Sequence, residues 1–281
     1  MSPTLLCMAS SELVMTSSLI KKTAFILALF AAIPSFAASD EDPYWSWFIN
    51  DSYRLVTSPN EADATWWTKA AVTVGGGLFF YGVDEEIREF IGNNHSSTAE
   101  SILDVGETFG NGLYILPAMG ITAGYAALSD DAYLMDTMKL SFEAVALSAV
   151  AVQFVKLTLH RHRPNKDDGA YRWEGPDYFN SSNDSFPSGH SAAAFSLATV
   201  ISKRYGDKNP WVSPIAYGLA TLTPLQRMYD DKHWASDVWV ASAFGYFLGG
   251  ALVDYHSEGE GFSLMPAITE DGPMLTLNWN F

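Results

Sequence analysis

Positively charged and imidazole side chains gather in three segments of the second half of the chain. These segments span 156–164, 187–190 and 227–237, and the middle one reads Pro-Ser-Gly-His. Guanidinium and ammonium groups bind anions, and a histidine can act as a nucleophile or move a proton. The residue types therefore point to an anion-binding site that could carry out nucleophilic or acid–base chemistry.

The first two segments predict donors at helix ends. Lys156 and Arg163 are seven residues apart, about two turns of an α-helix, so we expect both on one side of a helix that Pro164 ends. Ser188 precedes an apolar run and is typical of a helix N-cap. The free N–H groups behind such a cap, with the positive end of the helix dipole, favour an anion.

The third segment contributes Arg227, His233 and Asp237. His233 and Asp237 have the i,i+4 spacing of neighbours on a helix face, where a carboxylate can hold one imidazole tautomer. Taken singly, each segment also fits an ordinary role: a charge at a helix end, a cap, or a structural hydrogen bond. Together they favour one dense anion site, for which a phosphoryl group is the natural ligand.

The charge of the whole chain strengthens this interpretation. It has 16 Lys and Arg against 32 Asp and Glu, a formal net charge of -16. This balance argues against nucleic-acid binding, which needs a basic surface. A cationic cluster of opposite sign therefore needs a specific ligand. His160, four residues after Lys156, could face the site but fits a structural role at least as well, and His95 and His256 lack a motif and are expected on the surface.

Six charge-poor stretches with helical patterning must position these segments. They are 70–83, 108–129, 144–155, 185–202, 209–226 and 238–253. We predict an all-α bundle of about six core helices over residues 67–256, in which Gly75 to Gly77 allow close helix packing. In the tail, 257–281, apolar and polar residues alternate around Asp271-Gly272, which predicts a short C-terminal β-hairpin capping the helices.

The amino terminus predicts export. Lys21 and Lys22 precede a short apolar run, and small residues at Ser35 and Ala37 fit a cleavage site, so 1–37 reads as a signal peptide. An uncleaved anchor helix is the alternative. Residues 38–66 are polar and aromatic and are expected to form an irregular arm.

In order, the three segments resemble the pattern K-x6-R-P, P-S-G-H and S-R-x5-H-x3-D of the type 2 phosphatidic acid phosphatase superfamily. That superfamily includes bacterial class A acid phosphatases, lipid phosphate phosphatases and vanadium haloperoxidases. The resemblance covers roughly 70–255, and Gln226 stands where the pattern has serine. It implies that His233 attacks phosphorus, that Asp237 orients His233, and that His190 protonates the leaving oxygen. Phosphate would be held by five residues: Lys156, Arg163, Ser188, Gly189 and Arg227.

The expected function is hydrolysis of phosphomonoester or pyrophosphate groups, with lipids as the expected substrates, through a phosphohistidine on the periplasmic side of a bacterial envelope. No metal or other cofactor is expected, because cationic side chains supply the positive charge. No nucleic acid and no protein partner is expected either. A soluble periplasmic acid phosphatase of broad specificity is the nearest alternative. A vanadium haloperoxidase and a non-enzymatic envelope binding protein are remote ones. Membrane association is expected, but embedding stays open, because the apolar stretches are short or interrupted for a span of about 20 residues.

Overall fold

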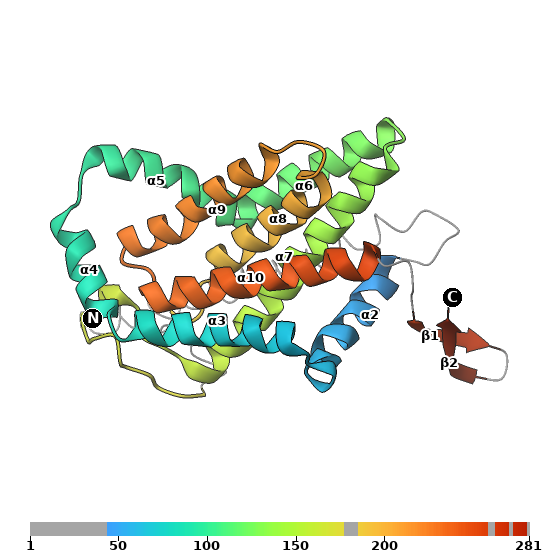
Figure 1. Ribbon diagram of the computed structural model, residues 1–281, viewed down its shortest axis with the longest axis horizontal. Coiled ribbons are helices and arrows are strands. Elements are labelled where there is room, and N and C mark those ends of the chain that lie inside the picture. Colours follow the sequence, from blue (N-terminus) through green and yellow to red (C-terminus); the bar gives the residue numbers. More distant parts are fainter. Residues whose placement is uncertain (1–43, 177–184, 258–261, 270–271, 280–281) are drawn as a thin grey trace, which may run out of the picture.

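The computed structural model describes residues 44–176 and 185–257, and the backbone of 262–269 and 272–279. The predicted signal peptide lies outside the described residues. The described part is almost entirely helical (Figure 1), as predicted. Its α-helices are α2 (Tyr44–Thr57), α3 (Ala64–Tyr81), α4 (Asp84–Asn93), α5 (Ser97–Gly110), α6 (Gly112–Leu128), α7 (Ala132–Leu159), α8 (Gly189–Tyr205), α9 (Val212–Tyr229) and α10 (Ala235–Ser257).

The predicted number of about six helices is too low for the described residues. Of the helices outside the six stretches, α4 covers residues 84–91, whose sequence indicates a polar amphipathic helix, and α2 and α5 carry charged residues and are only 14 residues long. They therefore do not stand out as charge-poor stretches. The irregular arm expected over 38–66 is wrong for Tyr44–Thr57, which is helical because its aromatic face packs on the core. Tyr44 is buried against Phe142 and Met138 of α7.

Short polar side chains begin most of the long helices by accepting a hydrogen bond from a free backbone N–H. Asp63, Ser96, Asn111, Asp131 and Ser188 cap α3, α5, α6, α7 and α8 in this way. Such caps satisfy donors that would otherwise lack a partner at a helix start. These local signals explain why these five helices begin where they do.

Helix α8 lies at the centre of the bundle and contacts α7, α9 and α10, while α3 packs outside α10 (Figure 1). Small residues permit these close crossings. A Cβ on Gly245 of α10 would lie 2.3 Å from the carbonyl oxygen of Ala192 in α8. On α3, a Cβ at Gly76 or Gly77 would meet Trp239 or Val240, which confirms the predicted packing role for these two glycines. Gly75 meets no atom within 4 Å.

Beyond α10 the described backbone contains two strands, β1 (Phe262–Thr269) and β2 (Gly272–Trp279). They pair antiparallel, with Phe262 opposite Trp279 and Thr269 opposite Gly272. Their side chains lie outside the described residues. The predicted packing of a C-terminal hairpin against the helices therefore stays a prediction.

Candidate active site

The three predicted segments meet where α7 and α9 end and α8 and α10 begin (Figure 1). Backbone hydrogen bonds join them: the N–H of Ser185 donates to the carbonyl of Arg161 (3.0 Å), and the N–H of Ser188 donates to the carbonyl of Asp237 (3.3 Å). The chain leaving α9 also turns back, because the N–H of His233 donates to the carbonyl of Arg227 (3.3 Å). One end of the bundle thus holds the predicted site residues.

The prediction that Lys156 and Arg163 lie on one helix is wrong. Helix α7 ends at Leu159, and His160 has a left-handed backbone (φ 42°) at the C-cap. Lys156 is buried in the last turn, whereas Arg163 has an extended backbone and starts the short helix η3 (Pro164–Lys166). The extended backbone follows because a proline disfavours α-helical geometry in the residue before it. Lys156 and Arg163 therefore reach the site from a helix and a loop.

Ser188 and Gly189 lie as predicted at the start of α8. The Ser188 Oγ is buried and accepts from the N–H of Ser191 (3.4 Å) and from the Ser191 hydroxyl (3.0 Å). Gly189 and His190 are the first helical residues, so their N–H groups belong to the free donors of the helix start. This end of α8 combines neutral donors with the positive end of the helix dipole.

The third segment also departs from the predicted helix face. Helix α10 begins at Ala235, so His233 lies in the preceding turn and only Asp237 is helical. The pair is nevertheless in contact: His233 Nδ1 is 3.6 Å from Asp237 Oδ2, an ion-pair separation longer than a hydrogen bond. Both side chains are almost completely buried. A turn, rather than a helix face, therefore brings the two side chains together.

Arg161, which the sequence motifs do not include, holds the other side of Asp237. Its Nη1 donates to Asp237 Oδ1 (2.5 Å), and its Nη2 donates to Asp84 Oδ2 (2.7 Å). All three side chains are fully buried. Ser236 completes the cluster, because its hydroxyl and N–H donate to the Asp84 carboxylate (2.6 and 2.9 Å). A guanidinium can join two carboxylates at once because its donors form a rigid planar fork.

Asp237 is therefore fixed on both oxygens. Its Oδ2 accepts from the Ser185 hydroxyl (2.5 Å) and from the N–H of Trp234 (2.9 Å), and its Oδ1 accepts from Arg161. The carboxylate can rotate little, so its Oδ2 stays on the Nδ1 side of His233. Nε2 is then the His233 nitrogen left for chemistry.

Both histidines are held neutral near pH 7. Burial, together with the charges of Arg227, His233, Lys156 and Arg163, lowers the pKa of His190 to about 3. Burial also lowers the pKa of His233 to about 4, against the opposing effect of Asp237. Lys156 and Arg163 act on both histidines, which places the cations around one common space. A neutral imidazole has the free lone pair that a nucleophile or base needs.

Gln226, which replaces the serine of the family pattern, holds Arg227. The Arg227 Nε donates to Gln226 Oε1 (2.6 Å), and the Gln226 Nε2 donates to Asp230 Oδ2 (2.7 Å). Arg227 Nη2 lies 3.5 Å from Asp230 and 3.8 Å from Glu107. The substitution therefore keeps a side-chain clamp on the guanidinium.

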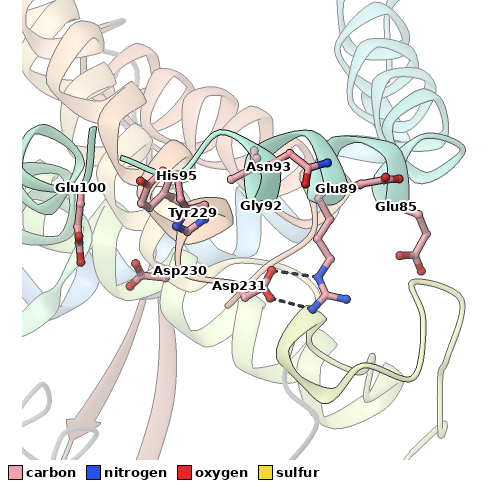
Figure 2. Close-up of a pocket in the computed structure, with 11 residues that line it drawn as sticks. Glu85, Glu89, Gly92, Asn93, His95, Glu100, Tyr229, Asp230 and Asp231 are labelled. Carbon is pink, nitrogen blue, oxygen red and sulfur yellow. Dashed lines mark hydrogen bonds and ion pairs between the residues drawn. The ribbon is translucent and has the colours of Figure 1, made fainter. Parts of the chain in front are cut away.

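A cavity of about 650 Å³ lies beside this site, between α4 and the end of α9 (Figure 2). Its lining includes Glu89, Glu100 and Asp231 and none of the predicted site residues, so its wall is acidic and unsuited to phosphate. Two hydrogen bonds from Arg88 to Asp231 (3.0 and 2.8 Å) cross its floor, as Figure 2 shows. These bonds tie α4 to the turn that leads to His233.

Comparison with known proteins places this site in a family. Residues 139–259 match the model of the PAP2 superfamily, and all the predicted site residues lie within that range. This segment is a PAP2 domain. The lipid A 1-phosphatase of Porphyromonas gingivalis is 43% identical over 65 residues, which are 23% of this chain and 15% of the relative. The chain therefore aligns with a small part of that protein's length.

Two solved structures resemble part of the chain. Aquifex aeolicus LpxE is 24% identical, with a TM-score of 0.47, and the match covers 62% of this chain and 96% of LpxE. The first transmembrane PAP2 type phosphatidylglycerolphosphate phosphatase from Bacillus subtilis is 21% identical, with a TM-score of 0.49. That match covers 67% of this chain and 97% of the Bacillus protein.

Proposed function

We propose that the chain is a phosphatase that hydrolyses phosphomonoester or pyrophosphate groups of lipids through a phosphohistidine. The observation that carries this proposal is His233, buried, neutral and backed by the fixed carboxylate of Asp237. The PAP2 match supports the reaction class, and the name of the Porphyromonas relative supports a lipid phosphate. Lys156, Arg163 and Arg227 supply the positive charge that a metal ion supplies in other phosphatases.

The reaction divides into two displacements at phosphorus. In the first, the Nε2 lone pair of His233 forms a bond to phosphorus while the bond to the leaving oxygen breaks, and His190 gives its proton to that oxygen. In the second, water attacks the phosphohistidine and gives a proton to His190, and the His233–phosphorus bond breaks. Asp237 stabilises the imidazolium form of His233, and phosphate and an alcohol (or a second phosphate) are released.

The protonation of His190 depends on the substrate. Without a ligand, burial and the surrounding cations keep the pKa of His190 at about 3, too low for an acid at neutral pH. A phosphoryl dianion neutralises those cations, which favours the protonated imidazole. Substrate binding therefore supplies the general acid that the first step needs.

We infer that the protein associates with the membrane of a bacterial envelope and works on the periplasmic side. By length and composition, α7 and α10 could cross a membrane, and about half of each apolar window is buried in the bundle. Large apolar side chains are also exposed on α3, on α6 and at the start of α9: Leu78, Phe79, Ile121, Leu128, Trp211 and Ile215. Exposed apolar surface of this extent is typical of lipid or protein contact.

His233→Ala tests the mechanism. We expect loss of hydrolysis of p-nitrophenyl phosphate and of lipid phosphates by about 10³-fold or more, with the fold preserved by circular dichroism. Trapping of ³²P-labelled protein from labelled substrate should succeed with wild type and fail with the variant. His95→Ala, an exposed histidine outside the site, is the matched control. Full activity of His233→Ala would refute the proposed nucleophile.

A second experiment separates the lipid phosphatase from the soluble acid phosphatase. Washed membranes are extracted with high salt and then with detergent, and activity is measured against phosphatidate and against soluble monoesters. We expect activity to leave the membrane only with detergent and to favour the lipid. Release by salt, with equal rates on soluble monoesters, would support the soluble enzyme instead.

A further inference from the structure

A second buried polar cluster lies on the bundle away from the PAP2 site. Asp51 of α2, Glu143 of α7 and His256 of α10 each offer one ligand atom, and these atoms all lie within 4.8 Å of one another. Glu143 precedes Lys156 by 13 residues on the same helix, which is about 20 Å. In Figure 1, α2 lies against the last turns of α10, whereas the PAP2 site lies at the first turn of α10. The two clusters are therefore separate.

One carboxyl group of this cluster has no hydrogen-bond partner among the described residues. Asp51 Oδ2 contacts His256 Nε2 at 2.6 Å, so one carboxylate has an imidazole partner. Glu143 is fully buried, and neither of its carboxyl oxygens has a hydrogen-bond partner among the described residues. Burial and the neighbouring Asp51 raise the pKa of Glu143 well above its usual value, because an ionised carboxylate without a partner costs several kcal/mol in a buried site. A cation at the common point of the three side chains would remove that cost.

We propose that Asp51, Glu143 and His256 bind one divalent transition-metal ion of the Zn²⁺ or Mn²⁺ class. Two carboxylate oxygens and one imidazole nitrogen form a mixed donor set that these borderline ions accept. Ligand atoms 2.0–2.2 Å from a tetrahedral ion lie about 3.4 Å apart. The Asp51–His256 contact must then open by less than about 1 Å, and water fills the remaining position.

The consequence is structural. The three ligands come from helices far apart in the sequence, so the ion ties α2 to α7 and α10 and closes two long loops. The Trp47 ring packs on the His256 ring, with centroids 4.1 Å apart, and orients the imidazole. This contact also corrects the expectation that His256 is a surface residue, since its side chain is only 20% exposed.

The experiment measures metal content and melting temperature on the full chain, purified without a histidine tag. Wild type, Glu143→Gln, Asp51→Asn and the control His95→Ala are stripped with EDTA, reloaded with Zn²⁺ or Mn²⁺, dialysed and analysed by mass spectrometry. We expect one ion per chain in wild type and control, and none in the other two variants. At 100 times Kd, the ion should raise the Tm of wild type by about 5–10 °C.

Phosphatase activity at 25 °C should be the same before and after metal removal, so this proposal and the proposed function fail independently. The titration of wild type keeps the test decisive even if both variants misfold. A wild-type chain that holds no ion and whose Tm does not respond to Zn²⁺ or Mn²⁺ would overturn the metal site. So would Glu143→Gln with a raised Tm, because two carboxyl groups sharing a proton would then explain the cluster.

Discussion

Arg161 provides the sharpest test of how the site is built. It is the fully buried cation between Asp237 and Asp84, and Arg161→Met removes it with little change in volume. Each carboxylate loses a partner at 2.5–2.7 Å. At an effective dielectric constant near 20, two unit charges about 4 Å apart attract by about 4 kcal/mol. Breaking a buried ion pair costs about 3–5 kcal/mol, so we expect a loss of unfolding free energy of that order.

The same substitution should impair catalysis through His233. Loss of a triad carboxylate lowers kcat by about 10⁴-fold in a well-studied case, and Arg161 acts one step further away. We therefore expect kcat to fall by about 10²-fold while KM changes little, because Arg161 lies behind Asp237 rather than in the phosphate site. Without the cation, Asp237 takes up a proton more easily, so the acid limb of the kcat profile should move to higher pH.

Urea unfolding and pH-dependent kinetics measure both effects. Arg161→Lys keeps the charge but not the fork, so it should recover part of the stability and of kcat. Arg204→Met is the matched control, because Arg204 donates to the Thr137 hydroxyl and the Tyr133 carbonyl at the far end of α8, away from the site. It should leave kcat unchanged. Unchanged stability and kcat in Arg161→Met would refute the positioning role.

Three further predictions follow from the packing and the electrostatics. Gln226→Ala removes the acceptor of the Arg227 Nε hydrogen bond and should lower kcat/KM by about 10-fold. Gln226→Ser should be less affected in the same assay. Gly245→Ala should lower Tm and should lower the free energy of unfolding, measured by urea denaturation, by about 1–3 kcal/mol, because the new methyl group meets a backbone carbonyl. Gly120→Ala places its methyl group in open space and should not lower the free energy of unfolding. His233 has a pKa of about 4 when folded against about 6.5 unfolded. Unfolding free energy should therefore fall as pH drops from about 6.5 to 4, and less so in His233→Asn.

Much of the site could be predicted because its signals are local. Ser188 precedes an apolar run and caps α8, and Arg227 lies in the last turn of α9, as their neighbours indicate. Two geometric predictions were wrong for local reasons. The helix expected to carry Arg163 ends at Leu159, and His233 lies in a turn rather than on α10. A spacing of four or seven residues is compatible with a helix, but it does not show that the residues are helical.

By itself, the sequence determined the residue types of the site, their order and the apolar helices that carry them. These depend on nearest neighbours and on helical periodicity. Only the tertiary structure decided that Arg161 joins Asp84 to Asp237, that Gln226 holds Arg227, and that α2 closes over Glu143. Arg161 lies 77 residues from Asp84 and 76 from Asp237 in the chain. No local pattern encodes such pairs, because they form only when packing brings distant helix ends together.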